Sequence, residues 1–302
     1  MSPHFDVYAY GVIASSTLHV LEDSFPASDG YAEVSRTYPM TGGEALNSAI
    51  VMSRLGLSVR LDGNWLGGDD EGRQLRNRIE GFGIDAERLA FGKDGAGARE
   101  VVMSDTTTRT IFGNYVALLS SGRQWHQPEE EDVAAARIVC VDPPLGAESL
   151  RVVQLALAAG VPFVSIDSPC DSELATRAAA IIVSGEFRGR EYPGARVDDL
   201  FEEYRSRADG LVVMTQGAGP ILFGRRDAGR RELDTFKVAA QDTAGAGDSF
   251  RAGLIYGLLA NMGDRDAVRY AAAVAGLICT RIPGVIDSPT NRDVEALLAT
   301  ET

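Results

Sequence analysis

The stretch Asp242-Thr243-Ala244-Gly245-Ala246-Gly247-Asp248 decides how this sequence is interpreted. It follows the partly apolar segment 236–240 and precedes an amphipathic run over 250–260, so it predicts a tight turn that leads into a helix N-terminus. Gly245 and Gly247 remove side chains where backbone amides approach a ligand. The unpaired amides of the first helical turn and the helix dipole favour an anion there, and a phosphoryl group in transfer is such an anion.

Asp248 lies beside this predicted anion site. Its carboxylate is placed to accept the proton of an attacking hydroxyl while the amides stabilise the moving phosphoryl group. The alternative is that Asp248 only caps the helix, a role worth about 1 kcal/mol. We favour the catalytic interpretation because the whole segment, and not one aspartate, has the composition that phosphoryl transfer needs.

Outward from this segment, strand-like apolar runs alternate with helical patterns. The alternation predicts βαβ units on a mostly parallel sheet, and therefore an α/β fold. Segments 15–40 and 97–115 break the rhythm, with short strands expected over 99–103 and 107–112. We interpret about 12–41 and 96–116 as a small β lid inserted into one domain spanning residues 1–302; ordinary surface hairpins are the alternative.

Segment 242–248 matches the Asp-Thr-x-Gly-Ala-Gly-Asp signature of ribokinase (PfkB-type) carbohydrate kinases. Other motifs of that family occur in the same order: Gly42-Gly43 with Asn47, Gly67-Gly68-Asp69-Asp70, and Thr215-Gln216-Gly217-Ala218-Gly219. The chain thus resembles this family over nearly its whole length. The resemblance implies a three-layer αβα core with a small lid, transfer of the ATP γ-phosphoryl group to a sugar hydroxyl, Asp248 as base, and an anion hole from the amides of Gly245, Ala246 and Gly247.

The resemblance also implies two groups of binding residues. Those expected at the phosphate acceptor are Ser16, Gly42, Gly43 and Asn47. Asp142, at the end of the strand expected over 138–141, and Arg109, in the predicted lid, are further acceptor candidates from their positions, and a structural role for either is the alternative. Those expected at the nucleotide are Thr215, Gly217, Gly219, Thr243, Ala272 and Gly276. Ser16 departs from the family, which usually has an aspartate there to hold sugar hydroxyls, so typical furanose substrates are in doubt. Arg109 would matter most for an anionic acceptor, because a guanidinium matches phosphate and sulfonate groups.

Cofactors and assembly rest on the resemblance as well. Mg²⁺ is expected with ATP, and the family's Asn-x-x-Glu motif falls near Ser184-Gly185-Glu186-Phe187, where only Glu186 in a shifted register fits; a solvated Glu186 is the alternative. K⁺ is expected near Asp242 and the loop 281–288. Relatives commonly pair lid strands across a dimer, so a homodimer is expected.

Composition excludes several other classes. The net charge of −14 on 302 residues argues against nucleic acid and anionic lipid as partners. The longest small-apolar run, 271–279, is too short for a membrane span. Three scattered cysteines indicate a reducing cytoplasm, and His4, His19 and His126 share no metal-ligand spacing. The acidic run 129–132 is interpreted as a solvated helix start.

Two alternatives to a sugar kinase stay open. A nucleoside kinase shares the signature but needs a flat, apolar or aromatic pocket for the base. A catalytically weak sugar- or nucleotide-binding regulatory protein would keep the fold without turnover, and Ser16 and the incomplete magnesium motif motivate it.

Overall fold

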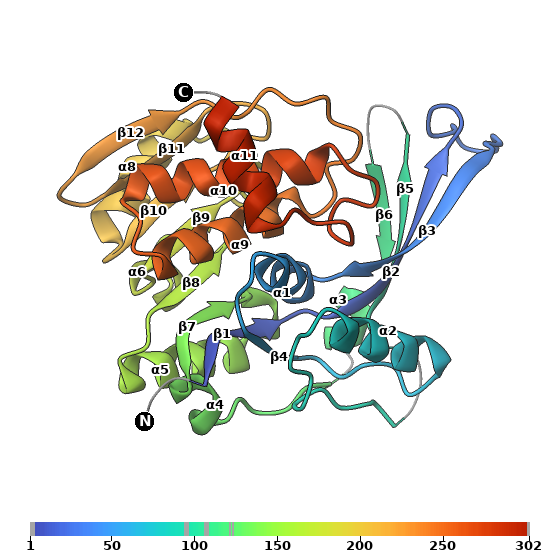
Figure 1. The fold of residues 1–302 in the computed structure, drawn as a ribbon, viewed down its shortest axis with the longest axis horizontal. Helices are drawn as coiled ribbons and strands as arrows, with labels where there is room; N and C mark the ends of the chain where they lie inside the picture. Colours follow the sequence, from blue (N-terminus) through green and yellow to red (C-terminus); the bar gives the residue numbers. More distant parts are fainter. Residues whose placement is uncertain (1–3, 94–96, 106–108, 121, 123, 301–302) are drawn as a thin grey trace.

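In the computed structural model, residues 4–93, 97–105, 109–120, 122 and 124–300 are described. Two sheets are present (Figure 1). The larger has the strand order β12 (Gly229–Leu233), β11 (Ile221–Arg225), β10 (Leu211–Met214), β9 (Ala180–Val183), β8 (Phe163–Ile166), β7 (Ala136–Val141), β1 (Phe5–Gly11) and β4 (Val59–Gly63). From β10 to β4 neighbouring strands are parallel, whereas β11 and β12 are antiparallel.

Helices cover both faces of the larger sheet. One face packs on α1 (Glu44–Arg54), α2 (Asp70–Gly81), α9 (Ala246–Leu259), α10 (Asp264–Cys279) and α11 (Asn291–Thr300). The other packs on α4 (Glu130–Ala134), α5 (Ala147–Ala159), α6 (Glu173–Thr176), α7 (Gly185–Glu191) and α8 (Val197–Arg207). Two short helices, α3 (Tyr115–Ser120) and η1 (Pro143–Leu145), lie in connections. The α/β fold predicted from the alternation of strands and helices is confirmed, and so are the three layers that the resemblance implies.

The period-2 pattern of β1 explains the two cores. Val7 and Ala9 point to the layer that contains α1 and α9, whereas Tyr8 and Tyr10 point to the layer that contains α5 and α8. All four side chains are fully buried. Such continuous apolar strands are typical of a parallel sheet covered on both faces.

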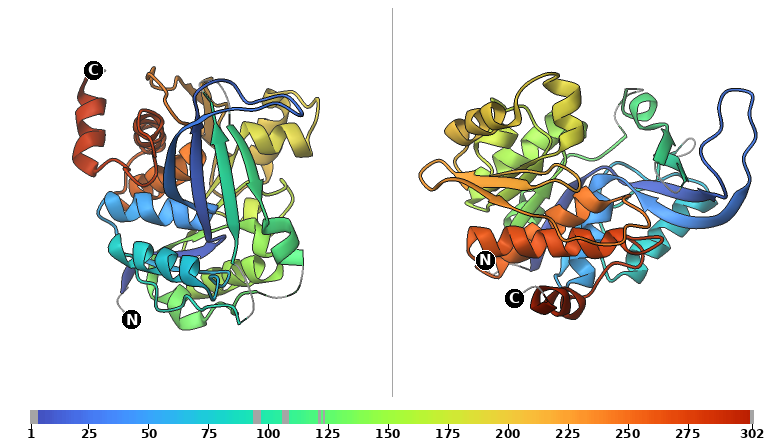
Figure 2. Two further views of the ribbon diagram at one scale, coloured as in Figure 1. Left: turned by 90° about the vertical axis from the view of Figure 1, so that its right-hand side faces the viewer. Right: turned by 90° about the horizontal axis from the view of Figure 1, so that it is seen from above.

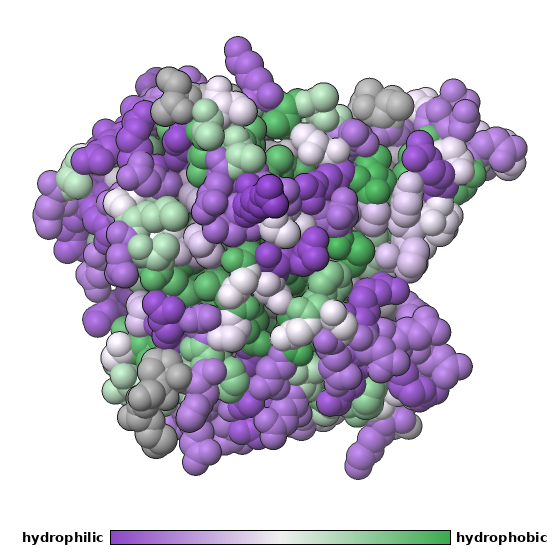
Figure 3. Space-filling view, viewed as in Figure 1, coloured by the Kyte–Doolittle hydropathy of each residue, from purple (hydrophilic) through white to green (hydrophobic). Residues whose placement is uncertain are grey.

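The smaller sheet has the order β3 (Val34–Gly42), β2 (Ala14–Leu21), β5 (Arg99–Ser104) and β6 (Arg109–Gly113). It stands out from the body, with the β2–β3 hairpin at its tip (Figure 2). In the space-filling view the surface recedes between this sheet and α2 (Figure 3). Residues 107 and 108, the start of the second strand expected there, lie outside the described residues.

Small residues bring α9 and α10 together. A Cβ built on Gly253 would lie 2.8 Å from Ala271 Cα, and one built on Gly257 would lie 2.8 Å from Ala267 Cβ. A side chain at either glycine would therefore force the helices apart. Within the part of the chain that the structure describes, no helix is long and apolar enough to cross a bilayer.

The expectation of a solvated helix start over 129–132 holds for Glu129, Glu130 and Glu131, which are exposed, and is wrong for Asp132. The acidic run does start a helix, α4, but Asp132 is 2% exposed and not solvated. Its carboxylate pairs with Arg60 Nη1 at 2.5 Å and Arg88 Nε at 2.6 Å. Nothing in the run itself reveals these partners, which come from segments 44 and 72 residues earlier in the chain.

Candidate active site

The glycine turn has the predicted form and opens onto the N-terminus of α9. Gly245 has a φ of 75°, and a Cβ there would lie 2.3 Å from Val285 Cγ2, so glycine alone fits. A Cβ built on Gly247 would meet nothing within 4 Å. The first-turn amides of α9 have no partner within the helix, and an unpaired helix N-terminus beside a glycine turn suits an anion.

Asp248, the third residue of α9, is held by residues of α1 and the segment before it. Asn47 Nδ2 donates to Asp248 Oδ2 at 2.9 Å, and Thr41 Oγ1 donates to Asn47 Oδ1 at 3.2 Å. Ser48 Oγ donates to the Asp248 carbonyl at 3.1 Å. Among the described residues none donates to Oδ1 of Asp248, so this oxygen is available to a ligand.

The surroundings raise the pKa of Asp248 to about 7, chiefly by burial. Asp142 and Glu100 raise this pKa further, while the charge of Arg251 and the hydrogen bond from Asn47 lower it. A carboxylate with a pKa near the working pH both exists in the basic form and has a real affinity for a proton. Asp248 has the properties of a general base.

Arg251 lies one turn after Asp248 and is fully buried. It pairs with Asp142 Oδ1 at 2.5 Å, donates to Ser48 Oγ at 3.1 and 2.9 Å, and donates to the Glu44 carbonyl at 2.8 Å. This guanidinium fixes α9 against α1. Because Arg251 and Asp142 are both buried, each charge is tolerated only when it is paired with the other.

Asp142 therefore lies beneath the site. Its exposure is 0%, its Oδ1 pairs with Arg251, and its Oδ2 accepts from the Val12 amide at 3.0 Å. A Cβ on Gly11 would lie 2.1 Å from Oδ2. Both carboxylate oxygens of Asp142 thus have donors from the protein, although its charge still acts on Asp248 and Glu44.

Ser16 and Gly42 both lie beside Glu100, and Gly43 directly precedes α1, whose Asn47 contacts Asp248. Ser16 in β2 pairs in register with Glu100 of β5, is 4% exposed, and its Oγ has no partner among the described residues. A Cβ on Gly42 would lie 2.3 Å from Glu100 Oε1 and 3.1 Å from the Tyr115 hydroxyl. Gly43 has a φ of 88° and closes the turn before α1.

The expected nucleotide residues follow the carboxyl end of β10. Thr215 directly follows this strand, Gly217 has a φ of 61° in open space, and the Gly219 amide donates to the Gln216 carbonyl at 3.0 Å. Arg188 Nη2 donates to the Thr215 carbonyl at 3.2 Å, and the enclosed Nε of Arg188 has no partner among the described residues. Burial lowers the pKa of Arg188.

Arg109 in β6 of the smaller sheet contacts Thr243 in the glycine turn. Arg109 Nη1 donates to Thr243 Oγ1 at 3.0 Å, so this arginine reaches the glycine turn. Of the two α10 residues, Ala272 is 5% exposed within the core, while Gly276 packs near Phe236 and Val238. Gly276 is thus the more accessible of the pair.

The two expected metal ligands differ in setting. Asp242 is 5% exposed; its Oδ1 accepts from the Ala244 amide at 2.9 Å, and its enclosed Oδ2 has no partner among the described residues. Glu186 is exposed in the first turn of α7. The described residues contain no group of three or more His, Cys, Asp or Glu side chains arranged to hold a metal.

Sequence reasoning missed Glu44, Glu100 and Arg251. Position does offer a signal for two of them, because Glu44 directly follows Gly43 and Arg251 lies three residues after Asp248 on the same helix face. No comparable local signal marks Glu100, which comes to the site through its pairing with β2.

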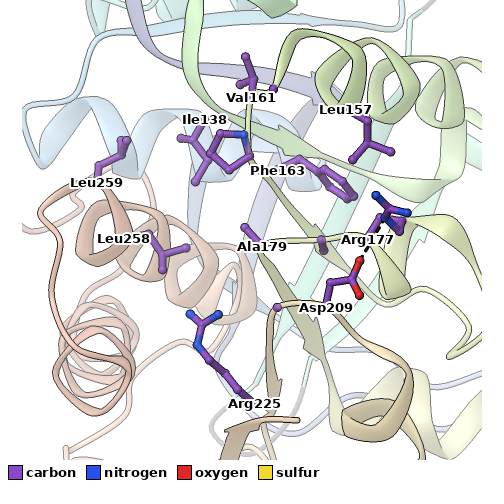
Figure 4. A pocket seen from close by; sticks show the side chains of 14 residues that line it. Ile138, Leu157, Val161, Phe163, Arg177, Ala179, Asp209, Arg225, Leu258 and Leu259 are labelled. Atoms are coloured by element: carbon purple, nitrogen blue, oxygen red, sulfur yellow. Dashed lines mark ion pairs between the residues drawn. The ribbon is translucent and has the colours of Figure 1, made fainter. Parts of the chain in front are cut away.

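A separate cavity of about 530 Å³ lies at the opposite edge of the larger sheet (Figure 4). Its wall includes Phe163 at the start of β8 and Leu258 near the end of α9, and the Arg177–Asp209 pair borders it. The carboxyl ends of the strands, where open α/β sheets bind ligands, are at the other edge. This cavity is therefore not the site that contains Asp248.

Comparison with known proteins adds three findings from sequence. The model of the pfkB family carbohydrate kinases matches residues 13–291. The chain is 28% identical to a nucleoside kinase of Methanothermobacter thermautotrophicus, over 92% of this chain and 90% of that one. It is 27% identical to an ATP-dependent ribose-1-phosphate kinase of Halopiger xanaduensis, over 92% and 93%.

Solved structures share the fold. The Arabidopsis thaliana ribokinase complexed with ribose and ATP superposes with a TM-score of 0.82 at 18% identity, covering 99% of each chain. The Methanocaldococcus jannaschii nucleoside kinase superposes with a TM-score of 0.78 at 17% identity, covering 100% of each.

Proposed function

The chain belongs to the pfkB family of carbohydrate kinases, ATP-dependent enzymes that phosphorylate a hydroxyl of a sugar-like molecule, and we propose that Asp248 is its catalytic base. The observation that carries this proposal is the contact between Asn47 and Asp248 at the N-terminus of α9. It orients one carboxylate oxygen and leaves the other for the acceptor hydroxyl.

The proposed reaction uses the two sides of the glycine turn. Oδ1 of Asp248 accepts the proton of the attacking hydroxyl, and the amides of Gly245, Ala246 and Gly247 hold the phosphoryl group in transfer. The Ala246 amide also donates to the Thr243 carbonyl at a long 3.3 Å, so a phosphoryl oxygen competes with a weak bond. Arg109 approaches the phosphates from the smaller sheet.

ATP would lie along the carboxyl ends of β9 and β10. The turn at Thr215, Gly217 and Gly219 offers backbone groups and an open surface for it. The half-buried guanidinium of Arg188 adds a positive charge beside this turn. Gly276 supplies a flat surface on α10 for the adenine.

The residues fit a magnesium ion bound mainly through the nucleotide. Mg²⁺ keeps several waters and uses one or two carboxylates together with substrate phosphates, so the exposed Glu186 suffices through water. When bound, the ion neutralises charge on the β- and γ-phosphates. Asp167, which is near Glu186, is engaged by Ser184. It accepts from the Ser184 amide at 2.7 Å and from the Ser184 hydroxyl at 2.8 Å.

A potassium ion near Asp242 is proposed on the unpaired, enclosed Oδ2 of that residue and the enclosed, unpaired Oγ of Ser288 in the neighbouring loop. A buried carboxylate oxygen without a donor needs a positive partner. Equal activity in potassium and in tetramethylammonium would remove the ion from this account.

Assembly as a homodimer is proposed through the smaller sheet, which forms a lid over the site. Its edge strand β6 exposes Ile111 and Phe112 at 49% and 53%, and Val116 follows at 81%. Exposed apolar side chains on an unpaired strand edge favour pairing with a second copy. Sedimentation as a monomer at micromolar concentration would contradict the dimer. A cytoplasmic location is proposed from the three free cysteines.

Two other functions remain distinguishable by experiment. A nucleoside kinase would respond to nucleosides, as the name of the Methanothermobacter relative suggests. A regulatory protein would bind ATP and sugar without turnover.

The test is ADP release with magnesium and potassium against neutral sugars, sugar acids, sugar phosphates, sulfosugars and nucleosides. We expect stimulation by one class of acceptor. Tight ATP binding without stimulation by any acceptor would reject the kinase assignment in favour of the binding protein.

A further inference from the structure

The acceptor end of the proposed active site is lined by carboxyl groups that no part of the reaction yet uses. Glu44 follows Gly43 at the start of α1, and Glu100 lies over Gly42. Glu44 is half-buried, yet its Oε2 is enclosed and has no partner among the described residues. An enclosed carboxyl oxygen without a partner is costly and needs a ligand to satisfy it.

Glu100 belongs to the face of the smaller sheet that turns toward the body. Ser16 is its neighbour in register, and Leu18 and Val102 on the same face pack near Ile282 of the loop beside α9. The Tyr115 hydroxyl donates to Glu100 Oε2, which fixes this carboxylate in place. The enclosed and unpartnered Ser16 Oγ is a second, independent sign that a polar ligand belongs here.

Three arginines lie in the elements around the acceptor end of the site, and each has contacts elsewhere. Arg251 is saturated by Asp142, Ser48 and the Glu44 carbonyl. Arg99 lies on the other face of the smaller sheet, beside Ser15, and pairs with Asp69 and Glu71. Arg109 contacts the neutral hydroxyl of Thr243 on the phosphate side. Arg251 is therefore not available to an anionic acceptor, Arg99 points away from it, and Arg109 is directed at the glycine turn, where the proposed reaction places the phosphoryl group in transfer.

The pKa of Glu44 reflects the negative charge of the groups around it. Burial, followed by the charges of Asp142 and Asp248, raises the pKa of Glu44 to about 8, although Arg251 acts in the opposite direction. The groups that face Glu44 also include Asp167, Glu100 and Tyr115. Near pH 7 Glu44 holds a proton and offers a sugar hydroxyl both a donor and an acceptor.

Resting on the proposed kinase function, we infer that Glu44 and Glu100 select an uncharged polyol as acceptor and exclude phosphorylated and sulfonated ones. The two carboxyl groups hydrogen-bond acceptor hydroxyls, together with Ser16. They replace Asp142, whose charge Arg251 neutralises. Above pH 8, where Glu44 is ionised, a phosphate on the acceptor would meet the carboxylates of Glu44, Glu100 and Asp248, while Arg109 is engaged at the glycine turn. This repulsion disfavours the phosphate by about a hundredfold or more.

The first experiment tests the contact. Glu44→Leu should raise the acceptor KM about tenfold or more, because the pocket loses a hydrogen-bonding group. Its kcat should stay within about threefold and its KM for ATP unchanged. Glu44→Gln should recover most of the loss at pH 7, since an amide also donates and accepts. Glu33→Gln, an exposed lid position with the same charge change, is the control.

The second experiment tests the charge. We would measure kcat/KM at pH 8.5 for two matched pairs, D-ribose with ribose 1-phosphate and D-fructose with fructose 1-phosphate. The wild type should prefer the neutral member of whichever pair it phosphorylates by about a hundredfold. The double variant Glu44→Gln with Glu100→Gln should reduce this ratio about tenfold or more. Equal or better use of a phosphorylated acceptor, or an unchanged ratio in the double variant, would overturn the inference.

Binding separates this inference from the kinase assignment. Calorimetric titration of the full chain with the same four compounds measures the selectivity of binding independently of turnover. Absence of turnover together with neutral-only binding would reject the kinase function and keep the selective site. Turnover of a phosphorylated acceptor would keep the kinase and reject the site.

Discussion

Asparagine in place of Asp248 should lower kcat by about 10³-fold, with a dissociation constant for ATP within about threefold of the wild-type value. The amide cannot take the proton of the attacking hydroxyl, but it keeps the size of the side chain and its contact with Asn47. The anion hole is made of backbone amides, so nucleotide binding is preserved. Single-turnover ADP formation and a fluorescent nucleotide titration measure the two quantities.

The pH profile supplies a second readout of the same residue. The pKa of Asp248 is raised to about 7, in a setting that contains Arg251, Asn47, Asp142, Glu100 and Glu44. Only the deprotonated form is a base, so kcat/KM of the wild type should rise about tenfold per pH unit below pH 7 and level off above it. The residual activity of the Asp248→Asn variant should lack this rise.

The matched control is Asp266→Asn, which makes the same change at the third residue of α10 and is exposed. It should leave both kcat and the pH profile unchanged. Equal loss of turnover and of ATP binding in the Asp248 variant would show that the residue maintains the structure of the turn, and the proposed base would have to be another group.

The sequence predicts most of what depends on local pattern. Segment 242–248 predicts the turn and the start of α9, and the alternation of apolar and helical patterns predicts the mostly parallel sheet. The carboxyl ends of β9 and β10 follow from the same alternation. These features can be predicted because a helix start, a tight turn and a buried parallel strand each have a signature within about ten residues.

What the sequence does not predict depends on pairs distant in the chain. Asp142 was expected at the acceptor because it follows a strand, but its partner Arg251 is 109 residues away and occupies it fully. Likewise Glu100 approaches Gly42 only through the register of β2 with β5. The sequence does not show which carboxylates the fold pairs with a cation. The acidic residues of the acceptor pocket can therefore be identified only from the contacts in the structure.

The Arg251–Asp142 pair should dominate the stability of this site. Both side chains are 0% exposed, and removal of one partner leaves the other charge buried and uncompensated. Arg251→Met should therefore lower the free energy of unfolding by about 3–5 kcal/mol. Urea denaturation at pH 7.5 measures this loss, and Arg196→Met is the control, because its pair with Asp199 is exposed at 78% and 77% and is worth well under 1 kcal/mol.

Adding Asp142→Asn to Arg251→Met should restore about 2 kcal/mol or more, since the amide removes the stranded charge and still accepts from the Val12 amide. Full recovery is not expected, because the contacts of Arg251 with Ser48 and the Glu44 carbonyl are lost as well. Additive losses in the double variant would contradict the coupling. A positive coupling would mean that Asp142 serves α9 and not the acceptor, which leaves Glu44 and Glu100 as the acidic groups that the acceptor meets.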